Sequence, residues 1–146
     1  MSYYPLISLM PKGSASLLLD LFPGAYTAFS TRKLRSAYSS DSIRVRRSVG
    51  TPAEQNIGFV GDNLDTTALS SFVGTGATDN GFITILNDQV ASFNLVQAAA
   101  LNQTKIVTAG VIETINTKPA INFTSNTGLG TASNLTLNDT SELWFF

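Results

Sequence analysis

The amino-acid sequence predicts a mainly β domain of the sandwich or barrel class, with two short helices and an extended N-terminal segment. Short apolar or alternating runs recur from residue 43 onward, and clusters of Gly, Asn and Thr separate them at intervals of roughly 8–12 residues. The length of 146 residues corresponds to one domain. Apolar residues make up 43% and charged residues only 13%, a composition that favours a packed core over disorder.

Residues 1–23 form an N-terminal docking segment ahead of a domain over residues 24–146. Turn-forming residues interrupt the segment, and it lacks the basic start of a signal peptide. Its leucine-rich run is too apolar to remain in water, so we expect it to contact the domain, a second copy or another protein. The predicted docking residues are Leu17, Leu18, Leu19, Leu21 and Phe22.

Two stretches have the apolar spacing of helices. A helix is predicted over residues 26–38, where apolar side chains recur near helical intervals at Ala25, Phe29, Leu34 and Tyr38. A hydroxyl of Ser30 or Thr31 is its expected N-cap. A second short helix is predicted over Asp62–Val73, with an apolar face formed by Leu64, Ala68, Leu69 and Phe72. Its expected N-cap is Asp62 or Asp65.

Strands are predicted by shorter patterns. Residues 43–47 alternate, so that Ile43 and Val45 lie on one side of a half-buried strand and Arg44 and Arg46 on the other. The apolar run at residues 81–86 predicts a strong strand. The remaining expected strands are residues 54–60, two short strands around the Ala109-Gly110 pair, and residues 118–124, 132–137 and 141–146.

The sequence ends in three consecutive aromatic residues, Trp144, Phe145 and Phe146. Consecutive aromatic side chains cannot all lie on one face of a strand, because successive residues point to opposite faces. We expect them to form a strand that is buried on both faces or to insert into a partner, since an exposed cluster would favour aggregation. The sheet is then completed by more of the same chain or by another subunit.

Basic residues gather in one part of the chain although the net charge is only −1. A patch of this kind can bind nucleic acid, an anionic polymer or an acidic face of a partner protein, or its side chains can pair with the acids of the later half. Nucleic acid is the least expected of these partners. The predicted basic patch contains Arg32, Lys33, Arg35, Arg44, Arg46 and Arg47.

The composition excludes several classes of site. The chain has no cysteine and no histidine, which rules out disulfides, zinc fingers, thiolate chemistry and Ser-His-Asp triads. The aspartates lack the spacing of a calcium-binding loop, so we expect no metal and no cofactor. No apolar run is long enough to span a bilayer, and no membrane contact is expected.

Several runs resemble a known family when they are taken together. AYTAFSTRKLRSAY, IRVRRS, EQNIGF, LDTTALSSFVG, GFITILNDQ and NQTKIV followed by KPAINF occur in this order. They resemble the opening of the arabinofuranosidase-B-type catalytic module, a similarity that covers roughly residues 17 to 146. That module is a concanavalin-A-like sandwich that also occurs in bacteriophage tail and other virion proteins. The resemblance implies a jelly-roll type β-sandwich for this chain.

The chain departs from the family at two points. The family's Trp-Tyr-Asp-Gln-Ser-Gly-Asn motif is replaced by Leu86 and Asn87, then the retained Asp88 and Gln89, then Val90-Ala91-Ser92. In the hydrolases the catalytic carboxylates lie beyond the region that this chain matches. The resemblance therefore implies a partial sandwich and argues against enzymatic activity.

Three functions remain open from the sequence. The first is a virion structural protein of a bacteriophage, a tail, fibre, collar or capsid-decorating component that docks on other virion proteins and forms a homo-oligomer by symmetric contacts. The alternative is a carbohydrate-binding module of a virion that recognises a host surface glycan for attachment. A glycoside hydrolase is the least expected. A glycan would be recognised by polar residues at loop tips, for which the candidates are Asp79, Asn80, Asn87 and Asp88.

Overall fold

The computed structural model describes residues 16–50 and 53–131. They form a mainly β fold of antiparallel pairs with two short helices, α1 (Leu18–Leu21) and α2 (Thr66–Val73), which confirms the predicted class. The seven-stranded main sheet contains β1 (Ile43–Arg47), β2 (Glu54–Ile57), β5 (Gly81–Leu86), β6 (Leu95–Val96), β7 (Lys105–Thr108), β8 (Val111–Ile112) and β11 (Gly130–Thr131). Two-stranded sheets are formed by β3 (Phe59–Val60) with β4 (Asn63–Leu64) and by β9 (Thr114–Ile115) with β10 (Lys118–Pro119).

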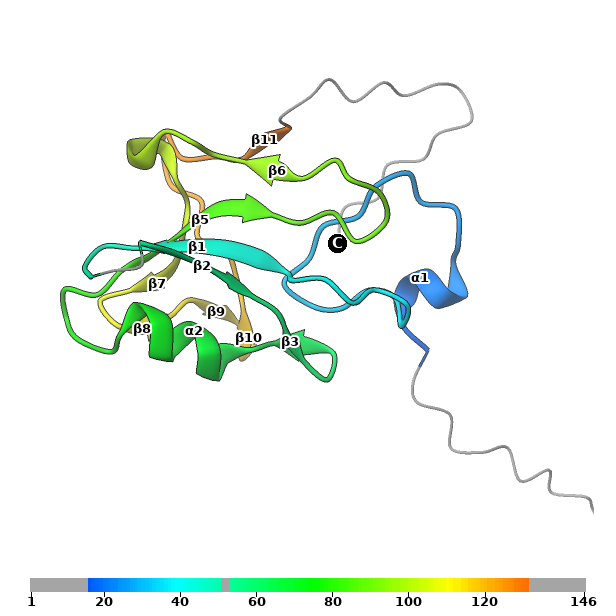
Figure 1. Ribbon diagram of the computed structural model, residues 1–146, viewed down its shortest axis with the longest axis horizontal. Coiled ribbons are helices and arrows are strands. Elements are labelled where there is room, and N and C mark those ends of the chain that lie inside the picture. Colours follow the sequence, from blue (N-terminus) through cyan, green and yellow to red (C-terminus); the bar gives the residue numbers. More distant parts are fainter. Residues whose placement is uncertain (1–15, 51–52, 132–146) are drawn as a thin grey trace, which may run out of the picture.

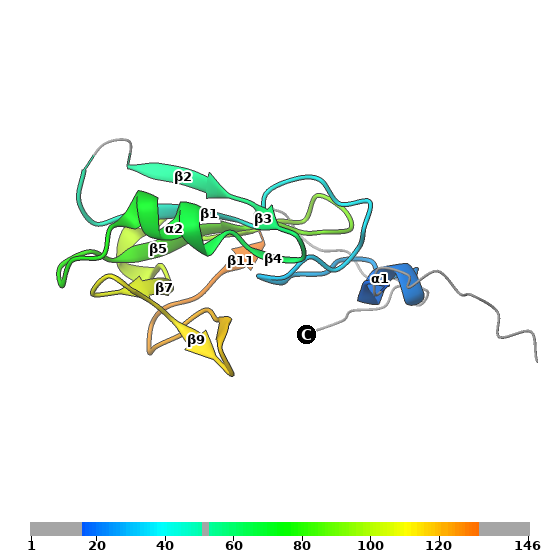
Figure 2. The same ribbon diagram turned by 90° about the horizontal axis from the view of Figure 1, so that it is seen from below.

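Strand β5 is the centre of the main sheet, whose order is β11-β6-β5-β1-β2 (Figure 1). One edge of β5 pairs with β1 along its length. The other edge is shared, because Gly81 and Phe82 pair with β7 and Ile85 and Leu86 pair with β6. Strand β8 then pairs with β7. Figure 2 shows the hairpin strand β9 projecting away from the layer formed by β1 and β5.

The main core lies between one face of this sheet and α2. The alternation of β1 places Ile43 and Val45, both fully buried, on the side of the helix and leaves Arg44 exposed on the other side. Each fully buried aliphatic side chain stabilises the fold by about 1.5–3 kcal/mol. The core residues are Ile43, Val45, Ile57, Leu64, Leu69, Phe72, Val73, Ile83, Leu86, Ile106 and Val107. The opposite face of the sheet, which we call the polar face, carries Arg44 and Arg46 beside their cross-strand partners Ile85 and Phe82.

The predicted second helix is confirmed with a shorter length. Helix α2 begins after Asp65, whose carboxylate accepts a hydrogen bond of 2.9 Å from the backbone N–H of Ala68. Asp65, not Asp62, is therefore the N-cap, and Leu64 lies in β4 before the helix. Leu69 and Phe72 are buried as the apolar spacing predicts.

The predicted helix over residues 26–38 is wrong. This segment is extended and irregular, with isolated β-bridges from Phe29 to Asp88 and from Arg32 to Asn63. Its backbone groups are satisfied by buried side chains from the loop after β5, so tertiary hydrogen bonds outweigh the helical spacing. The apolar side chains of Ala28 and Leu34 pack in a second, smaller core.

The strands predicted at residues 43–47 and 81–86 are confirmed at those bounds, and β7 and β8 flank the Ala109-Gly110 turn as expected. The 54–60 stretch is divided into β2 and β3. In the 118–124 stretch the strand is limited to β10. The strands predicted over residues 132–137 and 141–146, with Trp144, Phe145 and Phe146, lie outside the described residues.

The turn between β7 and β8 requires glycine, and replacing it tests the fold. Gly110 has a positive φ of 76°, and a Cβ atom there would collide with the backbone of Thr75. We expect Gly110→Ala to lower the free energy of unfolding by roughly 1–3 kcal/mol in urea denaturation. Gly128→Ala is the control, because a Cβ at Gly128 would meet nothing within 4 Å. Equal stability of the two variants would contradict this account of the turn.

Candidate functional site: a docking groove beside helix α1

Helix α1 is fixed to the domain on one side and exposed on the other. Leu19 is buried against Ala25, Ala28 and Leu34, and its N–H donates a 2.8 Å hydrogen bond to the carbonyl oxygen of Leu34. The side chains of Leu21 and Phe22 are 58% and 62% exposed. Figure 1 shows α1 beyond one end of the main sheet. The described part of the N-terminal segment thus packs on the domain through Leu19 and presents two large apolar side chains outward.

The carboxylate of Asp20 adds polar bonds that hold α1 in place. It accepts hydrogen bonds of 3.1 Å from the backbone N–H of Ser36 and one of 3.2 Å from the Ser36 hydroxyl. It also accepts a 3.3 Å bond from the backbone N–H of Leu17 at the start of the helix. These bonds are needed because a four-residue helix is not stable by itself in water.

An open groove of about 660 Å³ lies beside α1, and we call it the docking groove. Leu17 and Leu18 form one wall, and the β9–β10 hairpin contributes Ile115, Lys118 and Pro119. The hydroxyl of Thr31 donates a 3.0 Å hydrogen bond to the Pro119 carbonyl oxygen, which ties the hairpin to the extended segment. The groove brings two of the predicted docking residues together with two predicted basic residues, Arg32 and Lys33.

The charge of the docking groove is positive. Three cationic side chains line it, Arg32, Lys33 and Lys118, against the single carboxylate of Asp62. Arg35 lies near the other side of α1, in a small hollow shared with Leu19 and Phe22. Its Nε is buried without a hydrogen-bond partner among the described residues. The surface around α1 therefore suits a partner that offers carboxylates beside apolar side chains.

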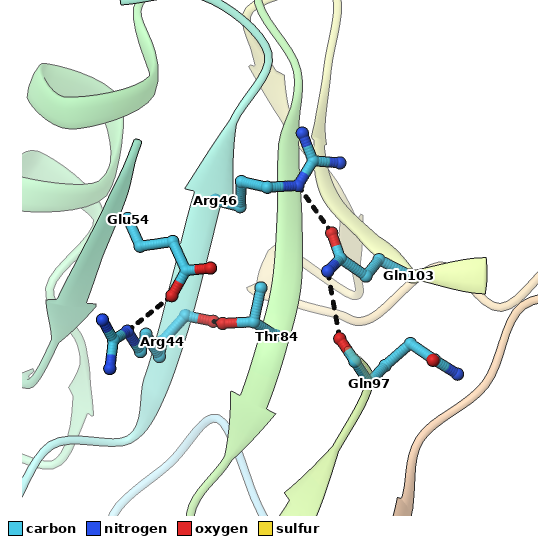
Figure 3. Close-up of polar contacts among 6 residues, drawn as sticks. All are labelled: Arg44, Arg46, Glu54, Thr84, Gln97 and Gln103. Carbon is cyan, nitrogen blue, oxygen red and sulfur yellow. Dashed lines mark hydrogen bonds and ion pairs between the residues drawn. The ribbon is translucent and has the colours of Figure 1, made fainter. Parts of the chain in front are cut away.

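The other predicted basic residues lie elsewhere, so the six do not form one patch. On the polar face of the sheet, Arg44 Nε lies 2.7 Å from Glu54 Oε2, which is the pairing with an acid that the sequence left open (Figure 3). Arg46 Nε donates a 2.7 Å hydrogen bond to Gln103 Oε1 on the same face. Arg47 lies on the face of α2, where it donates to the Phe72 carbonyl oxygen at 3.0 Å and lies over the Phe72 ring.

The four predicted glycan residues fall at two separate places. Asp79 and Asn80 precede β5, while Asn87 and Asp88 follow it, and a six-residue strand separates the pairs by about 20 Å. Asp79 Oδ2 accepts a 2.8 Å bond from the Gly76 N–H, and the Asn80 N–H donates to the Ser48 hydroxyl. Asp79 and Asn80 brace the loops at their end of the sheet, and the structure does not bring them to Asn87.

Asp88 organises the loop that follows β5. Its side chain is 3% exposed, and its carboxylate accepts hydrogen bonds from four backbone N–H groups. Oδ1 accepts bonds of 2.9 Å from Ala28 and Val90, and Oδ2 accepts longer bonds from Ala91 and Phe93. A buried carboxylate is stable when it is satisfied in this way. Asp88 thus links the loop to the extended segment.

Gln89 extends this link. Its side chain is fully buried, and Oε1 accepts a 2.7 Å hydrogen bond from the Leu34 N–H. Nε2 donates to the carbonyl oxygens of Ser30 and Arg32 at 3.1 and 2.7 Å. We call Asp88 and Gln89 the polar anchor. The sequence marked both residues as retained from a motif but gave no indication of their partners.

A polar hollow of about 330 Å³ lies at the Asn87 end of β5, and we call it the Asn87 hollow. Tyr38, Asp41, Asn56 and Asn87 line it together with the edge of Asp88. The Tyr38 hydroxyl donates a 2.9 Å hydrogen bond to the Asp41 carbonyl oxygen. Burial, followed by the negative charges of Asp41 and Asp88, raises the pKa of Tyr38 above 10.0, so this phenol stays neutral and keeps its proton as a donor.

The sequence missed two cations that the structure places at hollows, Lys105 and Lys118. Their isolation among the acids of the later half was the available signal. Within residues 16–50 and 53–131, no group of three or more His, Cys, Asp or Glu side chains is placed to hold a metal ion. No helix in the same part of the chain has the length and apolar character needed to cross a membrane.

The fold and groove together define a mainly β protein with an open, cation-lined groove beside α1, at one end of its sheet. Comparisons of the chain with protein-family models, with curated proteins and with solved structures found no match. The resemblance to the arabinofuranosidase-B-type module therefore stays a prediction that rests on the sequence motifs.

The polar anchor can be tested by replacing Gln89 with an apolar side chain of similar shape. Gln89→Met removes the bonds from Gln89 to the Leu34 N–H and the Arg32 carbonyl oxygen, and it leaves the Ser30 carbonyl oxygen with the Ser42 hydroxyl alone. We expect a loss of about 3 kcal/mol in unfolding free energy. Hydrogen exchange of the Leu34 amide should also become faster. Gln55→Met on the exposed part of β2 is the control and should change stability by less than about 0.5 kcal/mol. An unchanged Leu34 exchange rate in Gln89→Met would contradict the anchor.

Proposed function

We propose that the chain is a structural protein of a bacteriophage virion, a tail, fibre, collar or capsid-decorating component without enzymatic activity. The observation that supports this most is the exposure of Leu21 and Phe22 on a helix that Leu19 and Asp20 hold rigidly. Apolar side chains presented on a fixed element suit a permanent interface better than a mobile surface. The virion context comes from the sequence resemblance.

The cationic lining of the docking groove supports the choice of partner surface. Arg32, Lys33 and Lys118 outnumber Asp62 there, so an acidic and apolar segment of another virion protein is complementary to it. In the assembled particle, Leu21 and Phe22 would be covered by that protein and the sheet would project from it. Symmetric copies of the chain would surround the attachment point.

The finer fold that we propose is a concanavalin-A-like jelly roll, of which the antiparallel main sheet is one layer. Helix α2 covers one face of this sheet. Strand β2 pairs only with β1 among the described residues, which leaves an edge available to a further strand. Further strands from this chain or from a neighbouring copy would complete the sandwich.

Attachment through α1 can be tested in phage particles. We expect the double substitution Leu21→Ser with Phe22→Ser to lower the number of incorporated copies more than about tenfold, because two large apolar contacts are lost. Quantitative mass spectrometry of purified virions, with the chain supplied from a plasmid, gives the copy number. Val111→Ser is the control, since Val111 on β8 is 68% exposed and lines neither hollow beside α1. Absence of the unsubstituted chain from virions would disprove the proposal.

A carbohydrate-binding role is the second candidate, and the Asn87 hollow favours it. Amide, carboxylate and phenol groups line that hollow in the manner of a site that binds sugar hydroxyls.

If the hollow binds a glycan, a glycan array should identify a ligand whose affinity falls about tenfold in Asn56→Ala, since one hydrogen-bonding group is removed. Asn63→Ala, an exposed asparagine outside the hollow, should bind as the parent does. No binding by the parent chain, or equal binding by both variants, would remove this candidate.

A further inference from the structure

A second hollow of about 540 Å³ lies on the polar face of the main sheet, and we call it the sheet-face hollow. Arg46 of β1, Phe82 of β5 and Lys105 of β7 meet there, together with Gln103 and Leu101 from the segment before β7. It is distinct from the docking groove and from the Asn87 hollow, with which it shares no lining residue. Its residues come from β1, β5 and β7, which are distant in the sequence and become neighbours only in the folded sheet.

The cations of this hollow are held in place without being neutralised. The Arg46 guanidinium lies over the Phe82 ring at 4.4 Å from the ring centroid, and the bond from its Nε to Gln103 fixes its direction. Gln103 is fixed in turn by donating a 3.0 Å bond to the Gln97 carbonyl oxygen (Figure 3). Lys105 Nζ lies 5.7 Å from the same centroid. Among the described residues only Nε of Arg46 makes a hydrogen bond, so its terminal nitrogens remain available to a ligand.

The charge is unbalanced. Glu113 also lines the hollow, but no carboxylate of the described residues lies within 4.0 Å of Arg46 or Lys105. Arg44, on the same face of the same strand, is by contrast paired with Glu54. Glu54, the cross-strand neighbour of Arg46 in β2, is engaged by Arg44. The two preorganised cations therefore favour a ligand that brings its own carboxylates.

The surroundings favour a peptide over a sugar. The Arg46 guanidinium lies over the Phe82 ring, so it occupies a face on which a sugar would stack. Leu101 lines the hollow and is 94% exposed, and Phe123, between two lining residues, is 57% exposed. A ligand with carboxylates next to large apolar side chains matches this combination.

We propose that the sheet-face hollow binds residues 139–146 of a neighbouring copy of the chain. This segment, DTSELWFF, carries two carboxylates, Asp139 and Glu142, beside three aromatic residues. The carboxylates bind Arg46 and Lys105, and the aromatic side chains cover Leu101. Residues 132–146 follow β11 and can reach up to about 50 Å when extended, which is ample for a neighbouring copy.

The direction of β11 supports a contact between copies. Gly130 and Thr131 pair with Val96 and Leu95, which pair in turn with Ile85 and Leu86 of β5. Thr131, the last described residue, is therefore level with Leu86, and β11 runs away from the Phe82 end where the hollow lies. This inference rests on the proposed function, because it supplies the symmetric contact that the assembly requires.

Trp144 is the only tryptophan of the chain, so its fluorescence reports directly on the segment. In the full chain we expect blue-shifted emission that reverts to that of a water-exposed indole on dilution and at high salt. Arg46→Gln with Lys105→Gln should weaken this association about tenfold or more. Arg44→Gln with Glu54→Gln is the control and should leave the emission unchanged, because it removes both partners of the neighbouring ion pair and leaves no unpaired Glu54 carboxylate beside Arg46.

A charge-reversal set of variants shows whether a lost signal reflects lost binding or a misfolded hollow. Asp139→Lys with Glu142→Lys should abolish the blue shift, and combining it with Arg46→Glu and Lys105→Glu should restore it. Trp144 emission that changes in neither set of variants would overturn the proposal. A blue shift that does not depend on concentration would also overturn it, because the segment would then bind its own domain.

Binding of polygalacturonate that depends on Arg46, measured by calorimetry, would assign the hollow to an acidic glycan instead. Leu21→Ser with Phe22→Ser should not alter Trp144 emission, so failure of the virion test and failure of this one are distinguishable.

Discussion

The buried pair of Asp88 and Gln89 is the constraint on which the arrangement of this protein depends. The two side chains satisfy backbone groups of Ala28, Ser30, Arg32 and Leu34, and so hold an extended segment that has no regular sheet partner. That segment carries the pocket into which Leu19 fits. The position of α1, and of the apolar residues that it presents, therefore depends on hydrogen bonds made by the loop that follows β5.

Strand β1 divides the molecule into two chemically different faces. Its inward residues pack against α2, and its outward arginines, Arg44 and Arg46, lie on the opposite face of the sheet. The arginines differ in environment although they share a strand, because Arg44 bonds the carboxylate of Glu54 while Arg46 contacts an aromatic ring and an amide. The diagonal Arg44–Glu54 pair also places charges next to the edge strand β2, where they discourage unspecific pairing.

Local patterns in the sequence predicted those elements whose structure is decided locally. Strands β1 and β5 follow their alternation and apolar run, and α2 follows its cap at Asp65 and its apolar face. The segment over residues 26–38 has helical spacing as well, but its conformation is set by the side chains of residues about 60 positions later, which no local pattern shows. The sheet-face hollow escaped prediction for the same reason, since Arg46 and Lys105 meet only through their separate pairings with β5.

The hydrogen bonds that hold α1 have a mechanical meaning. A pulling force applied at the N-terminal segment reaches the domain through the Leu19–Leu34 backbone bond and through the bonds from Asp20 to Ser36. The force then reaches Gln89 through the hydrogen bond that the Leu34 N–H donates to Gln89 Oε1. Gln89 follows the central strand β5, which ends at Leu86. A force applied at α1 is thus carried to the central strand of the sheet, and it does not pull an outer strand away from the edge.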